Sequence, residues 1–200
     1  ATSGTRILLW FNLISENKKI TMGSSIETGT QPEFEVKAMG SFVQKPGCPE
    51  DAYNALGEER VDELCFNECY HPSDDRKFIH RIEVIKVLPQ EYVDQPIEGR
   101  ILDPWYTHYC DPNELGCSFK FSDKDFSIDQ KDVSYYVRAI EVPTPQINVK
   151  GGVCEFDAEG NCIKFKLCTQ DWRHPRDIET CSEIDEHRAW SSPIYLDYLS

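Results

Sequence analysis

The sequence predicts an all-β chain built as an antiparallel β-sandwich, with short helical and disulfide-pinned insertions. Three observations predict this fold. Apolar and polar residues alternate along several stretches, Pro and Gly separate these stretches at short intervals, and nine cysteines can cross-link the connections. A content of 40% hydrophobic and 12% aromatic residues is also sufficient for a buried core.

The clearest strand lies at residues 32–40, where Phe34, Val36 and Ala38 alternate with charged residues. This pattern indicates a half-buried strand, because successive side chains of a strand point to opposite faces. Residues 78–88 alternate in the same way, with Ile82 and Val84 opposed to charged neighbours. Both stretches are predicted strands of the sandwich.

Two further strands, at 132–142 and 188–198, are expected to pair with each other. In the first, the pattern places Tyr136 and Ile140 on one face and Tyr135 and Glu141 on the other, but the alternation is less clean, as expected for a strand buried on both sides. A tyrosine at the start of a penultimate strand resembles the tyrosine corner of immunoglobulin- and fibronectin-like sandwiches. Two ordinary strand tyrosines are the alternative, since strands accept Tyr freely.

Helical spacing occurs at residues 49–70, where Ala52, Leu56 and Leu64 recur near the period of a helix. Gly57 interrupts the pattern, and glycine weakens a helix interior. One or two short helices inserted between strands are therefore expected.

The same patterns divide the chain into regions. Residues 21–200 form the predicted sandwich domain, and residues 143–187 form a cysteine-rich insertion between its last two strands. Residues 1–20 are expected to lie outside the sandwich, as a tail and connection.

The cysteines are expected to form disulfides, since they lack the CxxC spacing of common metal sites. Three pairs bracket polar loops or turns: Cys154 with Cys162, Cys168 with Cys181, and Cys110 with Cys117. Cys48, Cys65 and Cys69 leave one thiol over, with Cys48 expected to bridge to Cys65 or Cys69. Disulfides indicate an oxidising compartment, so a secreted or periplasmic protein is expected.

The residue types suggest three candidate ligand sites. Cys48, Cys65, Cys69 and His71 provide the donors of a tetrahedral zinc site, although oxidation of the thiols is the favoured outcome. Acidic residues alternate at 123–132 as in a calcium loop but lack its Gly and terminal Glu, which favours a solvated acidic turn. A contact patch is expected at Trp172, Arg173 and His174.

The charge and the motifs argue against several classes of function. A net charge of −14 disfavours nucleic acid as a partner, because the chain would repel phosphate groups. The longest apolar run, residues 7–11, is far shorter than the roughly 20 residues of a membrane-spanning helix. The sequence shows neither a nucleophile motif nor a paired-histidine metal motif, so no catalytic residue and no cofactor is assigned.

Several stretches together resemble one bacterial family. They are "ATSGTRI" (1–7), "RIEVIKV" (81–87), "YYVRAIEVPTP" (135–145), "CEFDAEGNCI" (154–163) and "RAWSSPIY" (188–195). The family is similar to the PHP (polymerase and histidinol phosphatase) superfamily of metal-dependent phosphoesterases.

The resemblance implies that this chain is the C-terminal accessory domain of a secreted hydrolase. The missing N-terminal domain, a distorted α/β barrel, would be its partner and would hold the divalent metal ions. Residues 1–20 would be the tail of that barrel, and the chain alone would not be catalytic. A free-standing extracellular module that binds glycan or protein is the alternative.

Overall fold

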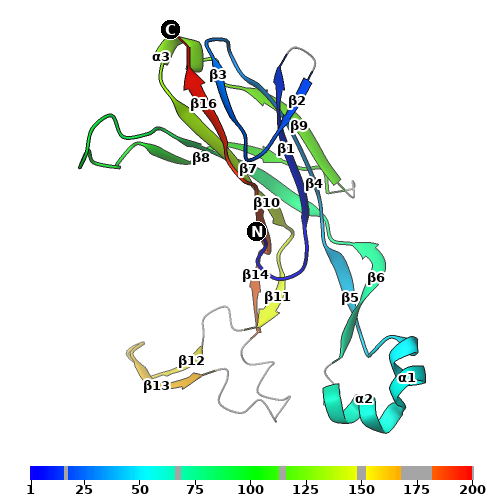
Figure 1. Ribbon diagram of the computed structural model, residues 1–200. Coiled ribbons are helices and arrows are strands. Elements are labelled where there is room, and N and C mark those ends of the chain that lie inside the picture. The colour runs from blue at the N-terminus through cyan, green and yellow to red at the C-terminus, as the bar shows by residue number, and fades with distance from the viewer. Residues whose placement is uncertain (16–17, 66–68, 113–115, 148–151, 168–181, 200) are drawn as a thin grey trace. The chain divides into compact units, whose positions relative to one another are not determined.

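The structure is a computed structural model, which describes residues 1–15, 18–65, 69–112, 116–147, 152–167 and 182–199 (Figure 1). The chain divides into two compact units. The first, called the two-sheet unit here, comprises residues 1–141 and 188–200, and the second, the insertion unit, comprises residues 142–187. Strands dominate the described residues, which confirms the expected β-rich class.

The first sheet of the two-sheet unit is antiparallel and has the strand order β2-β1-β4-β9. Its strands are β1 (Leu8–Ser15), β2 (Lys18–Thr21), β4 (Glu33–Met39) and β9 (Gly116–Ser122). Phe34, Val36 and Ala38 of β4 are buried, as their alternation with charged residues predicts.

The second sheet is mixed and has the order β3-β16-β10-β7-β8, with β15 also pairing with β10. Its strands are β3 (Ser25–Thr28), β7 (Ile79–Val87), β8 (Ile101–Tyr109), β10 (Val133–Glu141), β15 (Arg188–Trp190) and β16 (Ile194–Tyr198). The predicted pairing of the last strands is confirmed, because β15 and β16 both lie antiparallel to β10. The expectation of a purely antiparallel sheet is wrong, since β3 runs parallel to β16.

The core lies between these two sheets. Phe34 of the first sheet contacts Tyr135 of the second, with ring centroids 4.9 Å apart, and Trp105 meets the edge of Phe121 at 6.1 Å. Phe11 stacks on Phe34 at 5.3 Å. Aromatic rings of this size remove much apolar surface from water, so this cluster supplies a large part of the folding free energy.

The predicted orientation of β10 is wrong by one residue. Tyr135 is fully buried in the core, whereas Tyr136 is half-buried on the opposite face. Neighbouring residues of both faces of β10 and β7 are buried, including Ile140 and Ile85. Apolar residues therefore occupy both faces, and alternation alone cannot indicate which face meets the other sheet.

Residues 1–20 are part of the two-sheet unit, contrary to their expected place outside the sandwich. β1 is a central strand of the first sheet, and Phe11 and Leu13 are buried in the core. Ser3 and Ala1 also bind the backbone of β15, since the Ser3 amide donates to the Arg188 carbonyl at 2.8 Å. The expectation came from the resemblance of the first residues to the end of a barrel, whereas Phe11 and Leu13 alternate with less buried residues as in a strand that covers a core.

A helical arm (Phe42–Arg76) extends from the first unit between β4 and β7. It consists of β5 (Phe42–Pro46), α1 (Glu50–Leu56), α2 (Glu58–Cys65) and β6 (Tyr70–Arg76), with β5 antiparallel to β6 (Figure 1). The two short helices are separated at Gly57, as predicted, where a φ of 80° favours glycine. Within the described residues, no helix is long and apolar enough to span a membrane.

The base of the arm is fixed by buried polar contacts. The Ser41 amide donates to Glu141 Oε1 at 2.5 Å, and Arg76 donates to the Gly40 carbonyl at 2.7 Å. Gly40 must lack a side chain, because a Cβ there would lie 1.9 Å from the Lys77 carbonyl oxygen. These contacts join the arm to the end of β10.

The described residues of the insertion unit form two strand pairs. β11 (Thr144–Ile147) pairs with β14 (Ser182–Asp185), and β12 (Gly152–Phe156) pairs with β13 (Cys162–Leu167). The β12–β13 turn is held by Asp157, whose carboxylate accepts hydrogen bonds from the Asn161 and Glu159 amides at 2.7 and 3.1 Å. These two bonds are the turn chemistry that its sequence indicates.

We expect the two-sheet unit to stay folded when residues 149–181 are replaced by a short Gly/Ser linker. The replaced segment belongs to the separate insertion unit, and the linker would still allow β11 to pair with β14. Loop-closure entropy changes slowly with loop length, so the free energy of unfolding should change by less than about 1 kcal/mol. Urea unfolding followed by tryptophan fluorescence measures this change. Loss of the cooperative transition would contradict the division into two units.

Candidate functional site

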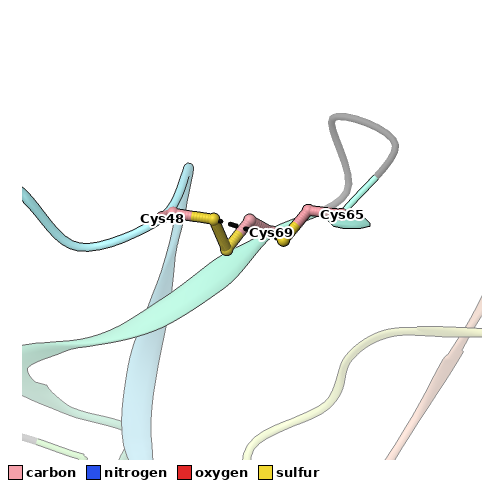
Figure 2. A group of neighbouring side chains, drawn as sticks. All are labelled: Cys48, Cys65 and Cys69. Carbon is pink, nitrogen blue, oxygen red and sulfur yellow. Dashed lines mark hydrogen bonds between the residues drawn. A yellow bond between two sulfur atoms is a disulfide. The ribbon is translucent and has the colours of Figure 1, made fainter. Parts of the chain in front are cut away.

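Three cysteines meet at the end of the helical arm. Cys48 precedes α1, Cys65 ends α2, and Cys69 precedes β6 (Figure 2). Cys48 and Cys69 form a disulfide with a Cα–Cα distance of 5.0 Å. The Sγ atom of Cys65, a free thiol, lies 3.4 Å from the Sγ atom of Cys48, and all three sulfur atoms lie within 4.8 Å of one another. A thiol is therefore in contact with a disulfide.

The local fold brings these residues together. The Gly47 amide donates to the Cys69 carbonyl at 2.7 Å, and the ring of His71 is hydrogen-bonded to the Gly47 carbonyl at 2.7 Å. These bonds extend the β5–β6 pairing to the disulfide. The break at Gly57 then lets α2 return toward the strands. Within α2, Val61 is the one buried residue.

The geometry bears on the zinc site, which is the less favoured alternative to oxidation of these thiols. Zinc binds thiolate sulfur, whereas Cys48 and Cys69 are bonded to each other and carry no thiolate while the bridge is formed. The Nδ1 atom of His71 is hydrogen-bonded to the Gly47 carbonyl, and His71 is not a member of the cluster of three sulfur atoms. The cluster therefore offers disulfide chemistry in this state.

A groove of about 950 Å³ lies on the two-sheet unit, beside the first residues of the chain. Its lining includes Arg6, Trp10, Trp190 and the turn residues Ser192 and Pro193. Trp10 is 46% exposed, although it lies on a central strand. An indole that the fold leaves uncovered in a hollow is a candidate contact for a ligand or a partner surface.

A buried polar network lies inside the two-sheet unit. Lys86 and the Tyr135 hydroxyl both donate to Asp123 Oδ2 at 2.6 Å, and the Asp125 amide donates to Oδ1 at 3.0 Å. Asp123 is 0% exposed and the Lys86 side chain is 6% exposed. Because every oxygen of the carboxylate has a donor, this network serves to hold the fold.

The network changes the acidity of its members. Burial raises the pKa of Asp123, but the hydrogen bonds from Lys86 and Tyr135 outweigh burial, so the pKa lies below its usual value. Burial and the Asp123 carboxylate raise the pKa of Tyr135 well above its usual value. Asp123 is therefore ionised and Tyr135 protonated at neutral pH.

The acidic segment after β9 is only in part the solvated turn that its sequence favours, because Asp125 and Asp129 are exposed whereas Asp123 is buried. Asp123 points into the core, and residues Phe126–Asp129 form the short helix α3. The oxygens of Asp123 are bonded to protein donors, so they are not directed toward a calcium ion. The alternation of acidic residues was the misleading signal. It resembles a calcium loop, but its first member, Asp123, belongs to a buried ion pair with Lys86.

The other predicted site residues are distributed as follows. The structure bonds Cys110 to Cys117 and Cys154 to Cys162, each across a short connection. Cys168 and Cys181 lie outside the described residues, as do all three members of the expected contact patch, Trp172, Arg173 and His174.

Sequence reasoning missed the groove because its residues come from both ends of the chain. Trp10 and Trp190 lie 180 positions apart, and the pairing of the first residues with β15 and of β3 with β16 brings those parts of the chain together. The one local signal was Trp10 itself, an indole at an outward position of a strand whose neighbours Phe11 and Leu13 are buried.

The chain matches no family model, no curated protein and no solved structure.

Proposed function

We propose that the chain is the C-terminal accessory part of a secreted or periplasmic hydrolase of the phosphoesterase type, similar to the PHP superfamily. In this proposal the two-sheet unit is an immunoglobulin- or fibronectin-like sandwich. The divalent metal ions and the catalytic residues belong to a domain that precedes Ala1 in the parent protein. The sequence motifs, the β-rich fold and the disulfides support it.

The groove is the observation that carries the proposal. Ala1 lies in its lining, and the Ala1 carbonyl accepts a hydrogen bond from the Trp190 amide at 2.8 Å. A domain joined ahead of Ala1 would therefore begin beside the exposed face of Trp10. Covering that indole would remove apolar surface from water and fix the orientation of the catalytic domain. We assign the groove as the docking surface for that domain.

The experiment is to express the gene from its own start codon and purify the mature protein. We expect a polypeptide well above the 23.1 kDa of this chain, with phosphoesterase activity that chelator removes and manganese or zinc restores. The 200-residue chain alone should show no such activity. A mature protein of about this mass, or metal-dependent turnover by the chain alone, would refute the proposal.

The docking surface is tested in the same mature protein. Trp10→Ala should increase the rate of limited proteolysis between the catalytic domain and the two-sheet unit, since it removes the exposed indole of the groove. Tyr92→Ala is the control, because Tyr92 is 62% exposed and does not line the groove. Equal proteolysis rates in the two variants would show that the groove is not the docking surface.

A free-standing binding module is the second candidate, and the composition of the groove favours it. Two indoles, the Arg6 guanidinium and the Ser192 hydroxyl can together contact the apolar faces and hydroxyls of a glycan. For this function, tryptophan fluorescence of the 200-residue chain should change saturably with a soluble polysaccharide. The change should be absent in Trp10→Ala and present in Tyr92→Ala.

A further inference from the structure

We propose that Cys48, Cys65 and Cys69 form a thiol–disulfide exchange site, in which one disulfide moves between Cys48–Cys69 and Cys48–Cys65. The proposal is independent of the hydrolase proposal, because the three residues lie at the end of the helical arm and share no residue with the groove. It concerns the arm and its reactivity toward small thiols and disulfides.

The sulfur atoms are already close, and the attack requires Cys65 Sγ to move into line with the Cys69–Cys48 bond. Cys65 Sγ lies 3.4 Å from Cys48 Sγ, and a disulfide would bring these atoms to about 2.0 Å. Cys65 is the last residue of α2. Since terminal helical residues lack part of the hydrogen bonding of the interior, a side-chain rotation with a small shift of the last turn can close this gap. Figure 2 shows the thiol of Cys65 directed toward the sulfur atoms of the bridge.

The exchange balances without an oxidant or a reductant. Cys65 loses its proton to solvent, and its thiolate attacks Cys48 Sγ. A bond forms between the sulfur atoms of Cys65 and Cys48, the bond between Cys48 and Cys69 breaks, and the electron pair leaves on Cys69. Cys69 then takes a proton from solvent, so the chain contains one disulfide and one thiol both before and after the step.

The burial of the sulfur-bearing residues favours exchange within the chain. Cys48 is only 9% exposed, whereas Cys65 and Cys69 are half-buried. External thiols have poor access to Cys48, while Cys65 already touches it. Cys48, which belongs to both bridges, is therefore the protected residue. The free thiol is Cys65 in one state and Cys69 in the other, and both residues are only half-buried.

The two bridges also constrain the unfolded chain to a similar extent. The present disulfide closes a separation of 21 residues, and the alternative would close 17. Chain entropy depends on the logarithm of this length, so it hardly distinguishes the two states. The folded state does distinguish them, because the present bridge ties the start of β6 to the end of β5, whereas the alternative would tie α2 to β5.

The experiment traps the thiol after incubation of the oxidised chain. The chain is held at about pH 8, where a thiol is in general partly ionised, and is then quenched in acid and labelled with a maleimide. A glutamyl endoproteinase cleaves after Glu68 and so separates the Cys65 peptide from the Cys69 peptide. We expect label on both peptides, with at least about 1% of the molecules labelled at Cys69 after minutes to hours.

Two variants serve as controls. Cys65→Ser removes the attacking thiol and should leave Cys69 unlabelled, whereas Cys69→Ser should yield the Cys48–Cys65 disulfide in the folded chain. The labelled fraction of wild-type Cys69 should not depend on protein concentration, since the exchange is intramolecular. A wild-type signal at Cys69 no greater than that of Cys65→Ser would overturn the proposal, even if Cys69→Ser failed to fold.

Discussion

Replacing Asp123 with alanine is expected to destabilise the two-sheet unit by about 3–5 kcal/mol, the usual effect of removing one partner from a buried ion pair. The Lys86 amino group would remain in the core without the carboxylate that lies 2.6 Å away. Its remaining neighbours are weak substitutes, because Asp129 is 4.0 Å away and half-exposed and the Trp105 ring is 5.6 Å away. The free energy of unfolding in urea measures the loss.

Tyr135→Phe is the matched control, because it keeps the ring and removes only the hydroxyl that donates to Asp123. We expect a smaller loss of about 1.5–3 kcal/mol, the range for a hydrogen bond to a charged group. An Asp123→Ala variant less destabilised than Tyr135→Phe would mean that the ion pair does not support the fold.

The same network sets how stability depends on pH. The pKa of Asp123 in the folded chain lies below its value of 3.8 in a model compound, so its contribution is complete above about pH 4 and is lost as the pH falls through the folded value. The pKa of Tyr135 lies above 10.0, so its contribution is complete below pH 10 and is lost as the pH rises beyond it. In Asp123→Asn, the loss of unfolding free energy that Asp123 causes at acidic pH should disappear.

The second large effect is expected at Tyr135, whose replacement by alanine should cost about 3–5 kcal/mol. The substitution leaves a cavity beside Phe34 and Trp105, whose rings lie 4.9 and 6.0 Å from that of Tyr135. Tyr136→Ala should cost only about 1 kcal/mol, because its ring is half-buried on the opposite face of β10. Thermal melts of the two variants under one condition give the comparison. A larger effect at Tyr136 would restore the orientation that alternation first suggested.

The contrast between β4 and β10 shows how far alternation can predict this fold. In β4, charged residues separate Phe34, Val36 and Ala38, and one face must therefore be the buried one. In β10 both faces are largely apolar or buried, so the orientation depends on a contact with Asp123, which precedes Tyr135 by 12 positions. Strands were therefore predictable, whereas the orientation of a doubly covered strand was not.

At the candidate site, too, some features could be predicted from local sequence patterns and others depend on distant contacts. Cys48, Cys65 and Cys69 were recognisable as a set with one thiol to spare, because the count of cysteines is odd. Their choice of partner depends on β5–β6 pairing, which places Cys69 beside Gly47. The groove requires still longer connections, since its two indoles come from opposite ends of the sequence. Local patterns carry no information about such contacts.

The parallel pair of β3 and β16 has a consequence for how the chain folds. Ser25 of β3 donates to Asp197 of β16, a residue 172 positions later, and the backbone of Ala1 and Trp190 is joined across 189 positions. During synthesis, Ser25 of β3 therefore emerges 172 positions before Asp197 of the strand with which β3 pairs. Contacts of such high order slow folding, because the entropy of closing the longest loops is lost before the pairing compensates for it. The uncovered edge of β10 would be open to pairing with other chains during this interval.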